Sequence, residues 1–302
     1  MTDDQAAPAA PSPAASRPHG AVVHARPAAP GDTVDGGRAG PGWIDHTWSG
    51  TTWSLADRLV RIKEADGDTD DPDAPTTGWV DAEAERHRWL ASRPEGLVVG
   101  PPEVVGPTRF ESTRPPGAPA HRPELHPRPD AVPAAVGTLL ARLHAIDVDH
   151  CPFRAPRSAL VEELGAAVGS GLLVPELLPP PYDRYQPEQL LAMVGEATPV
   201  DADPVVGHGG PVLSNLWIAT DGRPPEAEGG GAVTGLGRLG VTDRHLDLAI
   251  VHRQLHLAYG PEAVFAFHEA YGVEPGLVAL DQYLLIDVLR GALAGAVSPV
   301  PS

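Results

Sequence analysis

The spacing of hydrophobic and polar positions changes near residue 130 of the 302-residue chain. Before that point the apolar residues form short alternating runs at 59–63 and around Phe110, a pattern typical of strands. Residues 80–90 differ, because they favour a helix by propensity and carry acids in the first turns, where the helix dipole stabilises them. The first part is therefore predicted to be a small strand-rich unit with one helix.

Beyond residue 130 the apolar residues recur mostly at helical spacing. Short apolar runs at 204–206 and 216–219 interrupt the helices and predict strands. The Pro-rich stretch 115–129 marks the boundary between the two parts. The predicted fold class is α+β, with a strand-rich N-terminal part and a larger, mainly helical C-terminal part. Helices are predicted at 132–146, 157–169, 187–196, 244–258, 261–271 and 280–294.

The two ends of the chain are predicted to lie outside both parts. Residues 1–40 are rich in Ala, Pro and Gly and bury too little apolar surface to offset chain entropy, so they are expected to be a disordered leader. Order is expected from about Trp43. The domain boundaries are then 41–114 for the N-lobe, 115–295 for the C-lobe and 296–302 for a tail.

The composition limits the partners. A formal net charge of −18 excludes nucleic acid and anionic membrane surfaces, which repel an acidic protein. The apolar stretch 283–297 is broken by Asp287 and Arg290 and is too short to span a bilayer. The N-terminus has no apolar segment of the kind found in signal peptides, and Cys151 is the single cysteine. A cytoplasmic protein is expected, whose partner is a small molecule or another protein.

Lys63 and Glu83 are the first candidates for chemistry. A strand lysine followed about twenty residues later by a helical acid is the arrangement by which kinases grip nucleotide phosphates. Taken alone, this pair is weak evidence for a nucleotide site, since most such pairs are solvated surface charges.

Two later segments make the arrangement specific. Residues 205–215 read VVGHGGPVLSN and residues 233–249 read VTGLGRLGVTDRHLDLA. The sequence here resembles the aminoglycoside 3′-phosphotransferase family, which carries H-G-D-x-x-x-x-N followed by I-D-x-G-R-x-G and a D-x-A helix. Residues 83–91, 140–153 and the Pro116–Gly117 neighbourhood resemble further family segments, in family order. The positions in register are His208, Gly209, Asn215, Gly237, Arg238, Leu239, Gly240, Asp243, Asp247 and Ala249.

This resemblance implies a bilobal, protein-kinase-like fold that uses ATP and magnesium. It implies that Lys63 and Glu83 serve the nucleotide phosphates, with Ser49 and Thr51 in the covering segment 44–53. Asn215 is then a magnesium contact. The resemblance also implies catalytic roles for the loop that contains His208 and for Arg238. His208 itself is expected to make a buried hydrogen bond and not to replace the missing base. Asp243 and Asp247 are expected to be structural.

Two positions depart from the family pattern. The family's catalytic-loop aspartate, which orients and deprotonates the substrate hydroxyl, is replaced by Gly210. The family's magnesium-binding aspartate is replaced by Gly235. Loss of a positioned base costs about 10²–10⁴-fold in rate, and loss of the metal ligand removes several kcal/mol more of charge stabilisation. ATP and magnesium binding are therefore expected to be weakened or lost.

The substrate side departs as well. The family places acids before the catalytic strand to bind polycationic drugs, whereas 175–187 here reads PELLPPPYDRYQP. Asp183 is displaced from the acidic positions. Of the family's C-terminal acidic pair, Asp287 remains and Val288 replaces the other acid.

Three function classes stay open. The first is a pseudoenzyme that binds a small molecule, nucleotide or partner without transferring phosphate. The second is an active phosphotransferase with a rebuilt metal site, for which Glu226 and Glu228 in the insertion 221–232 could supply a carboxylate. The third is a fold repurposed for another reaction on a small metabolite.

Overall fold

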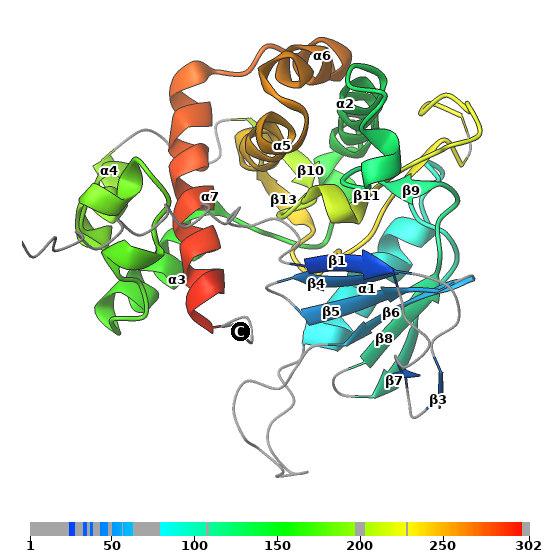
Figure 1. Ribbon diagram of the computed structural model, residues 1–302, viewed down its shortest axis with the longest axis horizontal. Coiled ribbons are helices and arrows are strands. Elements are labelled where there is room, and N and C mark those ends of the chain that lie inside the picture. The colour runs from blue at the N-terminus through cyan, green and yellow to red at the C-terminus, as the bar shows by residue number, and fades with distance from the viewer. Residues whose placement is uncertain are drawn as a thin grey trace, which may run out of the picture.

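The protein has two lobes of different composition, shown in Figure 1. A sheet with one helix forms the N-lobe, and helices around short strands form the C-lobe, so the predicted α+β bilobal fold is confirmed. The computed structural model describes residues 24–27, 33–34, 37–38, 43–47, 50–55, 57–62, 79–106, 109–196, 203–227 and 229–297.

The N-lobe is built on a six-stranded antiparallel sheet with the order β1-β4-β5-β6-β8-β7. Helix α1, Trp79–Ala91, packs its buried Val80 and Ala84 against Phe110 of β8. This contact explains why the helix interrupts a run of strands, since a sheet needs a cover over its apolar face. The strands are β1 His24–Pro27, β4 Trp43–Thr47, β5 Gly50–Ser54, β6 Arg58–Ile62, β7 Glu103–Gly106 and β8 Arg109–Thr113, and a separate pair is β2 Thr33–Val34 with β3 Gly37–Arg38.

The prediction of a disordered leader over residues 1–40 is wrong for His24–Pro27, Thr33–Val34 and Gly37–Arg38, which form strands. His24–Pro27 forms β1, which pairs antiparallel with β4 at the edge of the sheet. An edge strand is held by backbone hydrogen bonds to one neighbour, so it needs no apolar periodicity of its own. The composition of this segment therefore did not reveal the strand. Residues 1–23 lie outside the described part of the chain.

The chain passes from one lobe to the other after Thr113, where β8 ends. The next strand, β9 (Ala118–Pro119), pairs with β11 of the C-lobe. Gly117 makes this approach possible, because its φ is +89° and a Cβ there would lie 2.1 Å from the carbonyl oxygen of Ile218.

In the C-lobe the predicted helices are present, with small differences at their ends. Two antiparallel strand pairs lie among them, β10 with β13 and β11 with β12. The helices are α2 Ala131–His144, α3 Arg157–Gly169, α4 Pro187–Glu196, α5 Arg244–Tyr259, α6 Pro261–Tyr271 and α7 Leu277–Val297, and the strands are β10 Pro204–Gly207, β11 Leu216–Ile218, β12 Gly231–Val233 and β13 Gly240–Asp243.

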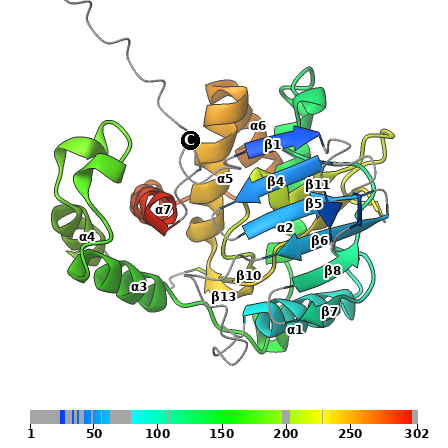
Figure 2. The same cartoon turned by 60° about the horizontal axis from the view of Figure 1, so that its bottom comes forward.

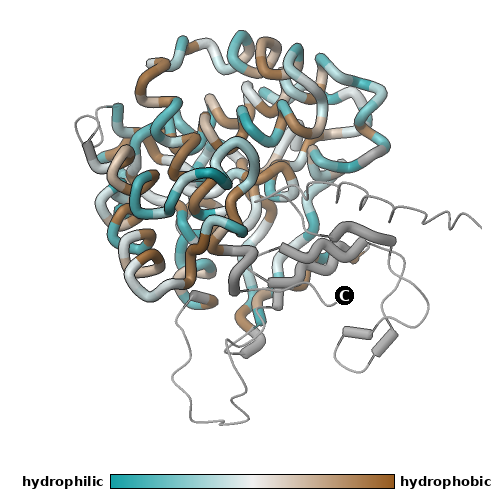
Figure 3. The backbone as a smooth tube through the Cα atoms, turned by 60° about the vertical axis from the view of Figure 1, so that its left-hand side comes forward, coloured by the Kyte–Doolittle hydropathy of each residue, from teal (hydrophilic) through white to brown (hydrophobic). Residues whose placement is uncertain are grey.

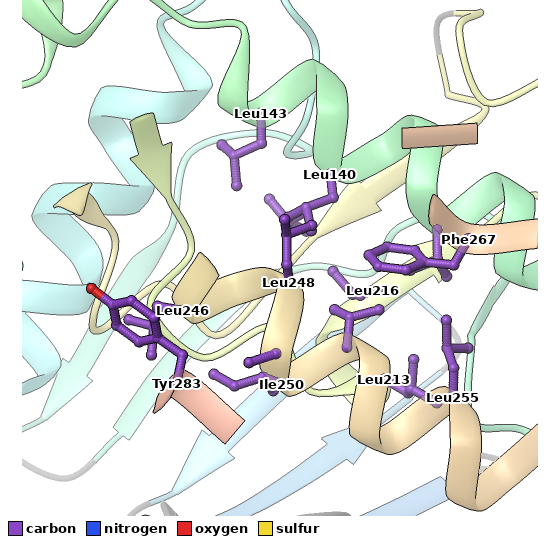
Figure 4. Packing of buried hydrophobic residues seen from close by; sticks show 14 of the residues in the cluster. Leu140, Leu143, Leu213, Leu216, Leu246, Leu248, Ile250, Leu255, Phe267 and Tyr283 are labelled. Carbon is purple, nitrogen blue, oxygen red and sulfur yellow. The ribbon is translucent and has the colours of Figure 1, made fainter. Parts of the chain in front are cut away.

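A single large core holds these helices together. Leu140 of α2, Leu248 of α5 and Phe267 of α6 lie close together in Figure 4, and all three are fully buried. Hydrophobic and hydrophilic positions alternate along the C-lobe helices in Figure 3, as expected for helices with one face on a core.

Helix α7 crosses the C-lobe between α4 and α5, as Figure 2 shows. It contributes Tyr283 and Ile286 to the core, and it carries Asp287 and Arg290 into the same surroundings. No helix in the described part of the chain combines the length and the apolar character needed to cross a bilayer.

Close packing of α2 on α6 depends on Gly137. A Cβ on Gly137 would lie 2.4 Å from the carbonyl oxygen of Phe267, which is a backbone atom that cannot move aside cheaply.

We expect Gly137→Ala to lower the free energy of unfolding by about 1–3 kcal/mol through overpacking. The matched control is Gly165→Ala in α3, where the new methyl meets only Leu191 Cδ2 at 3.9 Å. That change is expected to stabilise by up to about 1 kcal/mol. Urea denaturation measures both, and a Gly137→Ala protein as stable as the unmodified one would contradict this packing.

A histidine of α5 and a histidine of α6 meet where the two helices pack, and from this contact we predict that the stability depends on pH. The rings of His252 and His268 meet with Nδ1 and Nε2 3.2 Å apart. Burial first, and then the neighbouring His252, lower the pKa of His268 to about 4, and burial also lowers the pKa of His252. The unfolded chain takes up these protons near pH 6.5. The contribution of this neutral histidine pair to the free energy of unfolding is therefore complete above about pH 6.5. It is lost as the pH falls toward 4.

We expect this loss to be about 1–2 kcal/mol after discounting for solvent screening. Urea denaturation at pH 7 and pH 5 measures it. His268→Gln should flatten the dependence, whereas His150→Gln, at an exposed histidine, should not. Equal slopes in the two variants would show that the pair is not responsible.

Candidate functional site

The candidate site is built around Asp247, a fully buried carboxylate in the first turns of α5. Its Oδ2 accepts the backbone N–H of His208 at 2.6 Å, and its Oδ1 accepts that of Gly209 at 2.9 Å. His144 of α2 donates from Nε2 to Oδ2 at 3.1 Å. Burial alone would raise the pKa of Asp247, but the hydrogen bond and charge of His144 lower it. The carboxylate therefore fixes the start of the 207–215 loop.

Thr234 joins this loop to the following one, the 233–240 segment. His208 Nε2 donates to the carbonyl oxygen of Thr234 at 2.8 Å. The backbone N–H of Thr234 in turn donates to the carbonyl oxygen of Asn215 at 2.9 Å. The nitrogen of His208 that makes this bond carries a proton, so His208 serves as a structural donor, as the sequence suggested.

The backbones of the two loops also touch directly. Gly209 has a φ of +75°, and a Cβ on it would lie 2.4 Å from the carbonyl oxygen of Arg238. At the end of β13, Asp243 caps α5 by accepting the backbone N–H of His245 at 2.9 Å. The structural roles predicted for Asp243 and Asp247 are confirmed by these contacts.

Gly210 follows these loop contacts, and the space around its Cβ position is nearly empty. Among the described residues, leaving out its chain neighbours, one atom comes within 4 Å of a Cβ built there, and it is Arg290 Nη2 at 4.0 Å. The φ of Gly210 is outside the left-handed region, so a larger residue is sterically allowed. Gly235 differs, because its φ of +71° favours glycine.

The donor set does not fit a magnesium site of the kind the family resemblance implies. Gly210 and Gly235 offer no side-chain oxygen at the two aspartate positions, and Asn215 points its amide nitrogen toward the carbonyl oxygen of Gly210 at 3.5 Å. Magnesium prefers carboxylates, so one amide is a poor substitute. Across the ranges that the structure describes, no group of three or more His, Cys, Asp or Glu side chains could hold a metal ion.

The residues predicted to bind a nucleotide are described only in part. Glu83 of α1 is buried, and its Oε2 lies 3.6 Å from where a Cβ on Gly237 would be. It therefore faces the 233–240 segment across the two lobes. Lys63 and Ser49 lie outside the described residues, and Thr51 is described only through its backbone in β5. The predicted Lys63–Glu83 pairing stays a prediction.

Arg238 holds the 233–240 segment to α3. Its Nη1 and Nη2 donate to the two carboxylate oxygens of Glu163, both at 2.9 Å. Burial opposes ionisation of Glu163, but the hydrogen bonds and charge of Arg238 lower its pKa. This bidentate pair gives Arg238 a positioning contact. Its catalytic role stays a prediction.

The two acids predicted for substrate binding, Asp183 and Asp287, differ in their surroundings. Asp287 is buried and accepts from Arg253 Nε of α5 at 2.5 Å, and its substrate role stays a prediction. Sequence reasoning could not see this partner, which lies 34 positions away. Asp183 is exposed on the short turn Tyr182–Arg184 and stays a prediction. Glu226 is exposed in the insertion, and Glu228 lies outside the described residues.

Arg290 is the residue at this site that sequence reasoning missed. Its Nη1 donates to the carbonyl oxygen of Gly209 at 3.4 Å, in addition to the approach of Nη2 to the Gly210 position. The available signal was a basic residue within a mainly apolar helix that also carries Asp281 and Asp287. The sequence shows this charge but does not place it.

Comparison with known proteins gives a family over most of the chain. The sequence matches the phosphotransferase enzyme family over residues 38–283. An aminoglycoside 3′-phosphotransferase of Streptomyces ribosidificus is 31% identical over 206 residues, which cover 64% of this chain and 73% of that protein. The streptomycin 3″-kinase of Streptomyces griseus is 35% identical over 165 residues, covering 51% of this chain and 59% of that protein. The chain thus spans less than two thirds of this kinase.

Solved structures agree on the architecture. The crystal structure of an aminoglycoside 3′-phosphotransferase of type VIII has a TM-score of 0.62 and 25% identity, covering 88% of this chain and 93% of that one. An aminoglycoside phosphotransferase from Streptomyces rimosus, solved with ADP and streptomycin, has a TM-score of 0.59 at 22% identity, covering 79% and 90%.

The central role of Asp247 leads to a stability prediction. Asp247→Asn keeps the size of the side chain but replaces one acceptor oxygen with a donor that faces backbone N–H groups. We expect the free energy of unfolding to fall by about 2–4 kcal/mol, measured by chemical denaturation. The matched control is Asp221→Asn, at an exposed aspartate paired with Arg223, which should leave the unfolding midpoint unchanged. A comparable midpoint for both variants would mean that Asp247 does not anchor the loop.

Proposed function

Because the chain belongs to the phosphotransferase enzyme family, alongside the aminoglycoside 3′-phosphotransferases, we propose that it is a binding protein built on that scaffold. It binds a small-molecule ligand in the family's site and does not transfer phosphate. One observation carries this proposal: Gly210 and Gly235 stand at both aspartate positions inside a loop frame that is otherwise complete.

The completeness of the frame supports retained binding. A buried carboxylate such as Asp247 is destabilising unless all its partners are in place, and here His144, His208 and Gly209 all contact it. A chain without any selected function would not be expected to keep such a network. The scaffold is therefore better explained by a role that uses its shape without its chemistry.

The absent groups are those on which phosphoryl transfer depends. Catalysis of this reaction consists mainly of positioning and of stabilising charge by metal ions and donors. Gly210 supplies no proton acceptor, and Gly235 supplies no metal ligand. The combined loss amounts to at least about 10⁴-fold in rate. Lys63 and Glu83 could still contact a nucleotide, so nucleotide binding without turnover belongs to the proposal.

A rate measurement tests the proposal directly. ADP formation from ATP is followed with magnesium and with streptomycin or a kanamycin-like acceptor. The Streptomyces rimosus phosphotransferase serves as the positive control. We expect turnover at least about 10⁴-fold below that of the control. Magnesium-dependent transfer within about tenfold of the control would overturn the proposal and favour a rebuilt metal site.

A rescue experiment asks whether only the chemistry was lost. Gly210→Asp with Gly235→Asp restores both carboxylates, and the structure leaves room at position 210. Aspartate tolerates the left-handed backbone at position 235 at a cost of about 1 kcal/mol. We expect magnesium-dependent ATP hydrolysis to rise above the unmodified level, whereas Gly210→Asn with Gly235→Asn, with equal bulk and strain, should not raise it. Equal activity of the two double variants would contradict the assignment of these positions.

A further inference from the structure

Trp217 lies where the two lobes meet. It belongs to β11 of the C-lobe, and its side chain is 1% exposed. It forms a buried cluster with Leu59 of β6, in the N-lobe sheet, and with Ala232 of β12. Among the hydrophobic clusters of the described residues, this is the one that joins the sheet to strands of the C-lobe.

The fold holds Trp217 in this place from several sides. Its backbone is paired with Pro119 of β9 on one side and with Ala232 on the other. The guanidinium of Arg114, the first residue after β8, lies over the indole ring with Cζ 5.4 Å from the ring centroid. A cation over an aromatic face is attracted by the electrons of the ring. The indole is therefore held at the junction of the sheet, the linker and β11.

The linker between the lobes, residues 114–117, has few polar groups left for a ligand at this junction. The backbone N–H of Arg114 donates to the carbonyl oxygen of Asp57 at 3.0 Å. Pro115 and Pro116 have no N–H. The carbonyl oxygen of Gly117 accepts from Arg114 Nη2 at 3.2 Å. The first three linker residues thus offer no free backbone donor to a heterocyclic base.

Trp217 also stands between the two elements on which nucleotide binding is predicted. Leu59 is on β6, and Lys63 follows this strand in the sequence. Trp217 comes two residues after Asn215, the predicted magnesium contact. In a kinase-like fold the nucleotide lies between the strand of that lysine and the loop of that asparagine. An indole and a purine are both planar two-ring groups of similar size, so the side chain fills the space that one base requires.

Stability does not account for an indole at this position. Nε1 of Trp217 is buried and has no hydrogen-bond partner among the residues that the structure describes. A buried donor without an acceptor costs about 1–3 kcal/mol. A phenylalanine or a leucine would fill apolar space without this cost. The property that remains to be explained is the size of the ring system.

We propose that Trp217 is a specificity-determining residue whose indole occupies the place of a purine base, so that a nucleotide binds only by displacing it. This inference rests on the proposed function and narrows it, because it makes a nucleotide a weak ligand. The preferred ligand is then a molecule that does not insert a planar two-ring group between β6 and β11.

Binding of adenosine is the main test, because adenosine carries the purine base but no phosphate and needs no magnesium. Calorimetry compares the unmodified protein with Trp217→Leu, which keeps the apolar character and shortens the side chain. We expect a dissociation constant on the order of millimolar for the unmodified protein. Trp217→Leu should bind adenosine at least about tenfold more tightly, since the smaller side chain leaves a cavity. ADP should gain affinity in the same direction.

Phe267→Leu is the matched control. Phe267 of α6 is fully buried in the C-lobe core, so this change also removes an aromatic ring but not at the lobe junction. It should leave adenosine binding unchanged. Urea denaturation establishes that each variant folds. If Trp217→Leu does not fold, Trp217→Phe replaces it, because this variant keeps an aromatic ring and removes the unsatisfied N–H. It should show a smaller gain in adenosine affinity.

Fluorescence gives a second measurement on the unmodified protein. The difference between its emission and that of Trp217→Phe is the spectrum of Trp217. An indole in apolar surroundings without a hydrogen bond emits at short wavelength, so displacement into water by saturating ADP should move this spectrum to longer wavelength. Micromolar binding of ADP with an unchanged Trp217 spectrum would show that the base binds elsewhere.

Two further results would overturn the role of Trp217. The first is equal adenosine affinity of the unmodified protein and a folded Trp217 variant. The second is weaker binding by the variant, which would make the indole a stacking surface for the base and not an obstacle to it.

This inference and the proposed function fail in different experiments. Adenosine cannot donate phosphate, so its binding does not depend on whether transfer is lost. No transfer from ATP together with equal adenosine affinities would leave the binding-protein proposal standing and remove the role of Trp217. Transfer together with a gain of affinity in Trp217→Leu would overturn the binding-protein proposal and leave Trp217 as an obstacle to the nucleotide of an active enzyme.

Discussion

Asp247 is the buried charge on which the geometry of the 207–215 loop depends. Three donors from two segments, His144, His208 and Gly209, converge on its two oxygens. Because an ionised carboxylate in the interior must keep its partners, this network holds the loop in one conformation. The side-chain position of residue 210 takes no part in it. The frame of the site and its chemistry are therefore physically separable, and one could change without collapse of the other.

The acids near the 207–215 loop are paired with partners inside the protein. The overall charge of −18 predicts an attraction for cations, yet the acids near the loop are committed to internal partners. Glu163 holds Arg238, and Asp287 holds Arg253. Local fields in a partly desolvated site are set by the nearest charges, because solvent and salt screen the distant ones. The net charge of the whole protein therefore does not set the electrostatic field at this site.

The extent to which sequence predicted these features depended on how local their causes are. The helices at 157–169 and 187–196 were placed correctly, because apolar spacing along the chain reports burial directly. The edge strand His24–Pro27 was missed, since it depends on backbone pairing with β4 and not on its own side chains. The contacts of Asp287 and Arg290 were not foreseen, because their partners come from α5 and from the 207–215 loop, far away in sequence.

The two glycines differ in what each does to the site. At Gly235 the backbone is left-handed, so the glycine keeps a conformation that few other residues tolerate, and its effect is confined to the lost oxygen ligand. At Gly210 the backbone makes no such demand, and the effect of the glycine is the space it leaves beside Arg290. That space would hold a side-chain carboxylate if residue 210 were acidic. The backbone contacts that hold the loop come from the amides of His208 and Gly209 and not from the side chain of residue 210. The loop frame can therefore persist whatever side chain stands at residue 210.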